Sequence, residues 1–251
     1  MHNCLILGSG RSGTSMIGGL LAKAGYFMGD DLLPANNSNP KGFFEDVTVN
    51  AINEQILEPL SFKATHPFAR WFTDYPLTYG QHWLARVPVG IKIPSPQSAI
   101  DKIKEVTLRT PFCFKDPRFS YTLSVWRPHL VNTVFLCVFR DPATTAASIN
   151  KECGDDERLH SIKMNFDNAV DVWTLMYRHI LEIHRHQGEW LFMHYDQVLS
   201  GDVFDRLEEF IGTNVDRSFP EKKLRRSSSA RHVPRKSQQV YAQLCELAGY
   251  R

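Results

Sequence analysis

Cys4-Leu5-Ile6-Leu7-Gly8-Ser9-Gly10-Arg11-Ser12-Gly13-Thr14-Ser15 is the stretch of this chain that decides the fold. The apolar run at residues 4–7 predicts a buried strand, which ends in a glycine-rich turn. The apolar periodicity of Thr14 to Ala24, closed by Gly25, predicts a helix directly after the turn. Glycines let backbone N–H groups turn inward, and a helix N-terminus adds its positive end. The stretch therefore predicts a loop that holds phosphate.

The loop departs from the phosphate loop of kinases at one position. Gly8 and Gly13 have the GxxxxG spacing, but Thr14 stands where a lysine is expected. Enzymes of nucleoside triphosphates use that lysine, together with Mg²⁺, on the β- and γ-phosphates. The cation here is Arg11, before the second glycine, which suits an anion with fewer charges and no metal. A P-loop kinase acting on a small molecule is therefore a disfavoured alternative.

Strand and helix patterns alternate along the rest of the chain. We expect strands at 111–115, 133–139 and 190–194, helices at 47–57, 121–126, 165–186 and about 202–211, and a further helix opened by Asp141-Pro142. This order predicts an α/β fold: a single P-loop-like domain over residues 1–251, with a central parallel sheet flanked by helices. Residues 59–96 have no clear period, and we expect 59–110 to form an irregular cap. Ligands of such sheets bind beyond the carboxyl ends of the strands.

Composition narrows the class of protein further. The 251 residues are 43% hydrophobic and carry a formal charge of +2, which gives no case for nucleic acid as a partner. Residues 221–236 carry seven Lys or Arg residues against one acid, which suits a solvated arm or a segment that reaches over a phosphorylated ligand.

The cysteines and the apolar runs bear on the compartment. The five cysteines are odd in number and have no close pair, which argues against a disulfide framework and a zinc site and suits a reducing compartment. The first strand starts at Asn3, which leaves no room for a signal peptide, and no stretch reaches the ~20 apolar residues of a spanning helix. We therefore expect a cytoplasmic protein without a membrane span.

The phosphate loop resembles a known family. Gly8 to Ser15 is similar to the 5′-phosphosulfate loop of sulfotransferases that use 3′-phosphoadenosine 5′-phosphosulfate (PAPS), in the arginine form of the tyrosylprotein and bacterial members. The family's second signature is an arginine that ends a central strand and a serine eight positions later; Arg140 and Ser148 match it. The planar guanidinium of Arg140 suits phosphate oxygens, and the helix from Pro142 brings Ser148 round by two turns.

The resemblance implies a function and a set of binding residues. It implies transfer of a sulfuryl group from PAPS to a hydroxyl or amine without a metal, with 3′,5′-ADP as the product. Arg140 and Ser148 are then expected to hold the 3′-phosphate. The residues expected at the 5′-phosphosulfate are Gly10, Arg11, Ser12, Gly13, Thr14 and Ser15. A binding module without catalysis remains an alternative, which the cations and acids at the expected strand ends disfavour.

Three further segments resemble segments of the family to different degrees. Tyr195-Asp196 is similar to the Tyr-Glu-Asp segment whose tyrosine touches the adenine, although a structural tyrosine fits as well. Lys115-Asp116-Pro117 resembles the strand end whose lysine holds the sulfuryl group. Arg225 and Arg226 resemble the basic loop that closes over the cofactor, here residues 220–237; a solvated arm is the alternative.

Sulfuryl transfer also needs a base for the acceptor proton. Arg11 and Lys115 are our candidates for the cations that stabilise the transferred group. The histidine that many cytosolic members carry after this lysine is absent, and the resemblance to the arginine-loop branch implies a glutamate. Glu45 is our candidate base, and Asp46 and Asp116 are alternatives, because acids in the first turn of a helix also serve as caps.

No motif in the sequence identifies the acceptor. We expect a small-molecule, carbohydrate or lipid acceptor, selected by residues 59–110 and the C-terminal arm. The aromatic residues of 68–83 either line an acceptor pocket or form the core of the cap. His179, His184 and His186 lack the i, i+4 spacing of a metal-binding helix, and we interpret them as surface or packing residues.

Overall fold

A four-stranded sheet forms the centre of the described structure. The computed structural model describes residues 1–36, 39–61, 77–221 and 228–251. The strands of the sheet are β1 (Asn3–Leu7), β2 (Cys113–Lys115), β3 (Thr133–Phe139) and β4 (Trp190–His194). They lie in the order β2-β1-β3-β4, and every neighbouring pair is parallel. The predicted α/β class with a parallel sheet is confirmed.

The strand order reverses between β1 and β3. From β1 the chain moves outward to β2, and it then returns to the other side of β1 for β3 and β4. Parallel sheets bind ligands at such a switch point, outside the carboxyl ends of the strands. Here the switch point lies between the phosphate loop, which follows β1, and Arg140, which follows β3.

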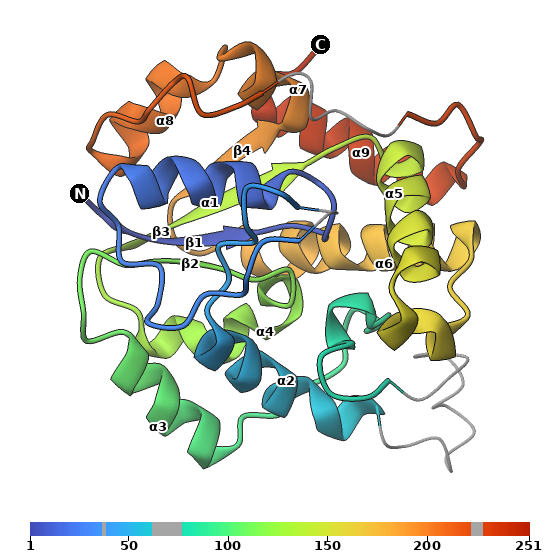
Figure 1. Cartoon of the computed structure of the whole chain (residues 1–251), viewed down its shortest axis with the longest axis horizontal. Helices are drawn as coiled ribbons and strands as arrows, with labels where there is room; N and C mark the ends of the chain where they lie inside the picture. Colours follow the sequence, from blue (N-terminus) through green and yellow to red (C-terminus); the bar gives the residue numbers. More distant parts are fainter. Residues whose placement is uncertain (37–38, 62–76, 222–227) are drawn as a thin grey trace.

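Both faces of the sheet are buried, which explains the continuous apolar runs of its strands. Cys4 and Ile6 point to one face, where α1 (Thr14–Lys23) and α8 (Phe204–Ile211) pack. Leu5 and Leu7 point to the other face, where α4 (Phe119–Trp126) and α6 (Phe166–His179) pack. Figure 1 shows α1 and α8 on one side of the strands and α4 on the opposite side.

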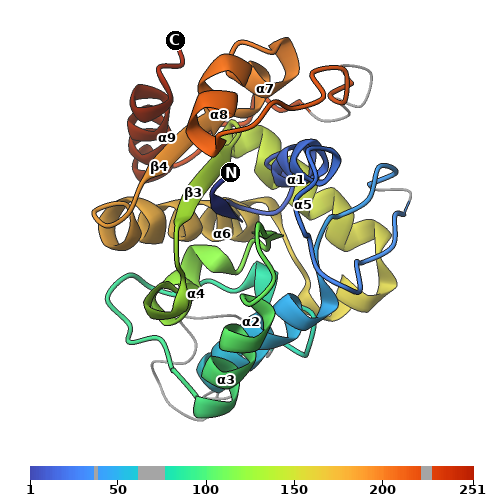
Figure 2. The same ribbon diagram turned by 90° about the vertical axis from the view of Figure 1, so that its left-hand side faces the viewer.

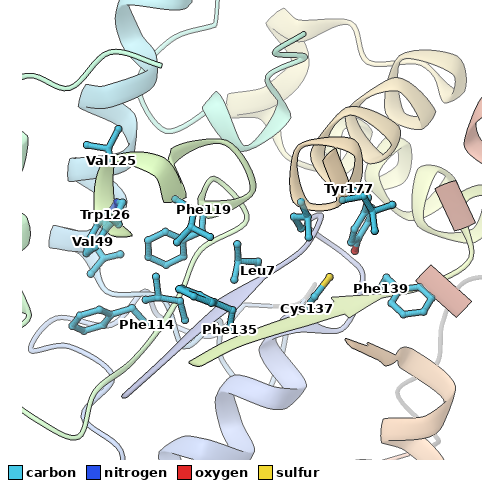
Figure 3. Packing of buried hydrophobic residues seen from close by; sticks show 14 of the residues in the cluster. Leu7, Val49, Phe114, Phe119, Val125, Trp126, Phe135, Cys137, Phe139 and Tyr177 are labelled. Carbon is cyan, nitrogen blue, oxygen red and sulfur yellow. The ribbon is translucent and has the colours of Figure 1, made fainter. Parts of the chain in front are cut away.

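The core under α4 and α6 is rich in aromatic side chains. Figure 3 shows Phe135 and Cys137 of β3 facing Phe119 of α4 and Tyr177 of α6. Trp126 meets Phe119 edge-on, with ring centroids 5.0 Å apart. These side chains are 3% exposed or less, so this face of the sheet is a closed packing layer and the ligand site has to lie at an edge of it.

The remaining helices surround this core. Their bounds are α2 (Val47–Ser61), α3 (Gln97–Val106), α5 (Pro142–Asp155), α7 (Tyr195–Ser200) and α9 (Arg235–Ala248). Short helical turns stand at η2 (His82–Leu84), η3 (Arg127–His129) and η4 (Glu157–Ile162), and the π-helical segment η5 (Ile180–His184) extends α6. Figure 2 shows α2 and α3 at the end of the molecule away from α7, α8 and α9. Within the described residues no helix is long and apolar enough to span a bilayer.

Several predicted elements have the expected bounds. The strands at 133–139 and 190–194 agree residue for residue. The helix opened by Asp141-Pro142 begins at Pro142, and the Asp141 side chain caps it by accepting the Thr144 N–H at 2.7 Å. Strong apolar runs and a capping acid are thus sufficient to place these elements.

Other elements differ from the prediction. The expected helix 165–186 is α-helical only to His179 and continues as the π-helix η5. Helix α3 falls inside the expected irregular cap at 59–110, and the expected loop 220–237 ends where α9 begins, at Arg235. Strand β2 starts at Cys113, α2 continues to Ser61, α4 starts at Phe119 and α8 starts at Phe204.

Candidate functional site

The phosphate loop has the conformation that its glycines suggest. Gly8 has φ 135°, and a Cβ there would lie 2.2 Å from the Val138 carbonyl oxygen. Gly13 is the left-handed N-cap of α1, and a Cβ there would lie 2.5 Å from the Tyr195 ring. A larger residue at either position would collide with β3 or with the tyrosine that follows β4. The loop therefore lies tightly between two strand ends.

A cleft of about 840 Å³ opens at this loop. The loop that follows β1, the residues directly after β3 and β4, and the last residue of β2 line it. Gly10, Arg11, Gly13, Thr14, Ser15, Lys115, Arg140, Ser148, Tyr195 and Glu45, all predicted from the sequence, line this one cleft. Among the predicted binding residues that the structure describes, only Ser12 does not line it, and its side chain is fully buried.

Glu45 and Lys115 form the centre of the cleft. Lys115, at the end of β2, donates from Nζ to Oε1 of Glu45, which lies two residues before α2. The same ammonium lies 3.3 Å from the Ser15 hydroxyl of the phosphate loop. Asn50 donates to the second carboxylate oxygen of Glu45 at 3.0 Å. An acid, a cation and the start of helix α1 thus meet at one point, although residues 15, 45 and 115 are far apart in the sequence.

The two alternative acids have structural partners. Asp46 is the N-terminal cap of α2: its carboxylate accepts the Val49 N–H at 2.9 Å and the Asp31 N–H at 3.1 Å. Asp116 is fully buried, and its carboxylate binds Asn53 and Arg118, both at 2.9 Å. Burial raises the pKa of Asp116 to about 6, against the opposing effect of Arg118. Glu45 is thus the one of the three that lines the cleft.

Arg140 and Tyr195 form a second group at the ends of β3 and β4. The Arg140 guanidinium carbon lies 4.4 Å from the centroid of the Tyr195 ring, a cation–π arrangement. Both residues are less than 9% exposed, yet both line the cleft. Trp173 of α6 fixes the local backbone by donating to the Arg140 carbonyl at 3.2 Å. This stack extends the cation-rich wall of the cleft beyond the phosphate loop.

Arg11 faces helix α5. Its φ of 68° is unusual for a residue with a side chain. Its Nε donates to the Ser148 hydroxyl at 3.2 Å, and its Nη1 lies 3.5 Å from a carboxylate oxygen of Glu152. Arg11 therefore contacts Ser148, the serine predicted to work with Arg140.

The predicted basic loop is described only in part. Arg225 and Arg226 lie outside the described residues. Lys41 donates to the Phe219 carbonyl and pairs with Glu221 at 2.8 Å, and Phe219 and Glu221 line the cleft. The described chain therefore reaches the cleft directly before the segment 222–227.

Several residues of the site were not predicted from the sequence. Asn39 donates to the Ser15 hydroxyl at 3.0 Å, and Asn50 binds Glu45. Trp83 lies against Gly10, and Glu152 pairs with Arg11. Both asparagines flank Glu45 in the sequence, which is a weak signal for their role, whereas nothing local marks Trp83 or Glu152.

The three histidines divide into two kinds. His179 and His184 are buried, and His186 is exposed. His179 binds the Val87 carbonyl through Nε2 at 3.0 Å, which is a packing role. Across the described ranges, no three His, Cys, Asp or Glu side chains are grouped as metal ligands would be.

Comparison with known proteins gives matches among solved structures. No protein-family profile and no curated protein matches the sequence. The sulfotransferase domain of the olefin synthase of Synechococcus PCC 7002 superposes with a TM-score of 0.55 at 13% identity, over 97% of this chain and 94% of that domain. The sulfotransferase domain from the curacin biosynthetic pathway also gives 0.55 and 13%, over 100% and 98%. The chain has the sulfotransferase fold. Its cation-lined cleft lies at the switch point between β1 and β3.

Proposed function

We propose that this chain is a sulfotransferase that moves a sulfuryl group from PAPS to a hydroxyl or amine. The observation that carries the proposal is the Glu45–Lys115 pair, whose ammonium also reaches Ser15 of the phosphate loop. A base and a cation in contact with an anion-binding loop are the groups that in-line transfer of an anionic group needs. The fold shared with two sulfotransferase domains supports the same class of reaction.

The residues of the cleft fit a nucleotide with two separate phosphate positions. The N-terminus of α1, Thr14 and Ser15 provide donors for the 5′-phosphate, because the first N–H groups of a helix have no intrahelical partner. Arg140 and Ser148 would hold the 3′-phosphate, and the Tyr195 ring would flank the adenine. The donor supplies the activated sulfuryl group when it is bound.

The chain's own groups account for the remaining steps. Glu45 takes the proton from the acceptor hydroxyl while the acceptor oxygen forms its bond to sulfur. The bond between sulfur and the 5′-phosphate oxygen breaks, and its electron pair leaves with 3′,5′-ADP. Lys115 and Arg11 stabilise the negative charge on the sulfuryl and bridging oxygens.

We also propose that the enzyme works in the reducing cytoplasm. The five cysteines are unpaired and four of them are buried, which supports this compartment.

Thermal unfolding with different nucleotides tests the proposal. We expect 3′,5′-ADP to raise the Tm and ATP with Mg²⁺ to leave it unchanged, because the loop has Thr14 in place of the kinase lysine. Stabilisation by ATP with Mg²⁺ alone would point to the kinase alternative. Binding of 3′,5′-ADP without turnover of PAPS by any acceptor would point to a binding module.

A further inference from the structure

The cleft continues past Glu45 and Lys115, away from the phosphate loop. Leu33, Pro34, Val47, Tyr79 and Trp83 line this part of the cleft, called the outer half below. If the proposed function holds, the outer half receives the acceptor. Part of its wall beside Glu45 is apolar, because Leu33, Pro34 and Val47 line the cleft there, and Leu33 donates its N–H to the Glu45 carbonyl. Tyr79, which is 73% exposed, and Trp83 line the cleft from the segment 78–83.

Four charged side chains that line the described part of the cleft are paired with one another. Glu45 binds Lys115, and Glu54 accepts Nε of Arg118 at 2.6 Å. Burial alone would raise the pKa of Glu54, but the contact with His82 and the charge of Arg118 outweigh it and lower that pKa. A charged acceptor would enter a cleft whose counter-charges are already engaged, and removing its charge from water is costly without a new partner.

The side chain of Gln81, two residues before Trp83 and also at the cleft, is engaged as well. Gln81 uses its carbonyl oxygen for the Thr78 N–H at 3.0 Å and its amide for the Arg158 carbonyl at 2.7 Å. Arg158 in turn binds Asp156. A carbohydrate needs several hydrogen-bond partners along its ring, and both ends of the Gln81 amide are already used within the protein. An apolar body needs none of them.

Trp83 is held in a fixed position next to the reacting centre. The Glu54 carboxylate accepts the Gly80 N–H at 2.8 Å, the His82 N–H at 3.2 Å and the His82 ring, which fixes the turn that carries the tryptophan. A Cβ on Gly10 would lie 2.8 Å from two carbons of the Trp83 ring, so the indole rests on the phosphate loop. Its half-buried ring forms a flat apolar wall between the loop and the outer cleft.

We propose that the acceptor is an uncharged, largely apolar alcohol or phenol that packs against Trp83 and presents its hydroxyl to Glu45. The apolar body gains by leaving water, and the hydroxyl meets the only kind of group that it needs, a carboxylate that accepts its proton. This inference rests on the proposed function and narrows the acceptor to one chemical class. Carbohydrates and acidic acceptors are the classes that it excludes.

An acceptor panel with labelled PAPS tests the inference. The panel contains 2-naphthol and 1-octanol as neutral apolar acceptors, N-acetylglucosamine as a carbohydrate, and 4-hydroxybenzoate as an acidic phenol. We expect kcat/KM for an apolar acceptor to exceed that for the other two classes by 100-fold or more. A preference for the carbohydrate or the acid, with 3′,5′-ADP still raising the Tm, would overturn the inference and leave the proposed function intact. Failure of 3′,5′-ADP to bind would overturn both.

Variants of Trp83 supply the second readout. We expect Trp83→Ala to raise KM for the apolar acceptor at least 10-fold, and Trp83→Phe to restore most of the loss because it keeps a flat apolar ring. Neither variant should weaken 3′,5′-ADP binding more than a few-fold, which shows that the loop remains folded. An unchanged KM in Trp83→Ala, with normal binding of 3′,5′-ADP, would refute the contact.

Discussion

Replacing Glu45 by glutamine separates catalysis from binding. Lys115 can donate to the side-chain oxygen of the introduced glutamine as it does to Glu45, and Asn50 has a buried side-chain oxygen without a partner that can accept the new amide after the Asn50 side chain turns over. The variant therefore keeps the shape of the centre. It loses only the ability to take a proton and the negative charge beside Lys115.

The expected magnitudes follow from these two losses. A positioned general base contributes about 10²- to 10⁴-fold to rate, so we expect kcat of Glu45→Gln to fall by that factor. Breaking a buried ion pair costs about 3–5 kcal/mol, and the retained hydrogen bonds should reduce that loss here. Lys115 then has less compensating negative charge in the cleft, so 3′,5′-ADP should bind as tightly as before or more tightly.

Two neighbouring acids serve as matched controls. Asp46→Ala removes a helix cap and should lower the free energy of unfolding by about 1 kcal/mol, with kcat within a few-fold of the parent. Asp116→Ala leaves Arg118 without one of its buried partners and should cost about 3–5 kcal/mol. Urea unfolding gives the free energies, and transfer from labelled PAPS to the best acceptor of the panel gives kcat.

The result that would refute the assignment is specific. A folded Glu45→Gln variant with kcat within a few-fold of the parent would show that the base is elsewhere. A 100-fold loss of kcat in Asp46→Ala, at normal stability, would move the assignment to that residue.

Two further predictions concern the nucleotide site and the core. Arg140→Ala should weaken 3′,5′-ADP binding roughly 10- to 100-fold, because charge-assisted hydrogen bonds contribute about 1.5–3 kcal/mol, and should change 5′-AMP binding little; equal losses by calorimetry would show that Arg140 does not contact the 3′-phosphate. Burial lowers the pKa of His184 from 6.5 to about 3, with smaller effects of His179 and Arg127, so the unfolded state takes up a proton first as the pH falls below 6.5. Stability contributed by this histidine should drop by about 1.4 kcal/mol between pH 7.5 and 5.5 in urea unfolding. His184→Gln should remove that drop, and the exposed His186→Gln should keep it.

The elements that local sequence determines were predicted well. Residues 133–139 form an unbroken apolar run that only a strand buried on both faces accommodates, and its bounds agree. Helices α3 and α9 carry apolar side chains at helical spacing, such as Val240 and Leu244, but neither was predicted: α3 lies in the segment 59–110 expected as an irregular cap, and α9 begins inside the expected basic loop 220–237. The change from α6 to the π-helix η5 has no such pattern, because it depends on contacts made after folding.

The residues of the site were predictable where topology places them. Lys115, Arg140 and Tyr195 stand at carboxyl ends of parallel strands, so the sheet brings them together once its strands are known. Trp83 and Glu152 come from segments whose positions depend on packing. Nothing in their immediate sequence shows that they reach the cleft.

The position of Glu45 shows how packing completes the site. The residue before it, Phe44, has φ 55°, an unusual conformation for a bulky residue that requires support from its surroundings. Its ring packs edge-on against Phe219, with centroids 6.1 Å apart, over helix α1 at Gly18 and Gly19. A Cβ on Gly19 would lie 2.2 Å from the Phe219 ring and 3.0 Å from Phe44.

The packing of Phe44 and Phe219 therefore explains why two glycines stand inside helix α1, which the helix alone does not explain. Each glycine within a helix costs about 1 kcal/mol relative to alanine, so two in succession in α1 weaken it. The gap that they leave admits Phe44 and Phe219, and the turn at Phe44 then directs Glu45 toward Lys115. Glycines inside a helical pattern indicate a close approach of another segment. Gly18 and Gly19 were thus the sequence signal that a loop with aromatic residues packs against α1, and the same packing places the acid of the cleft.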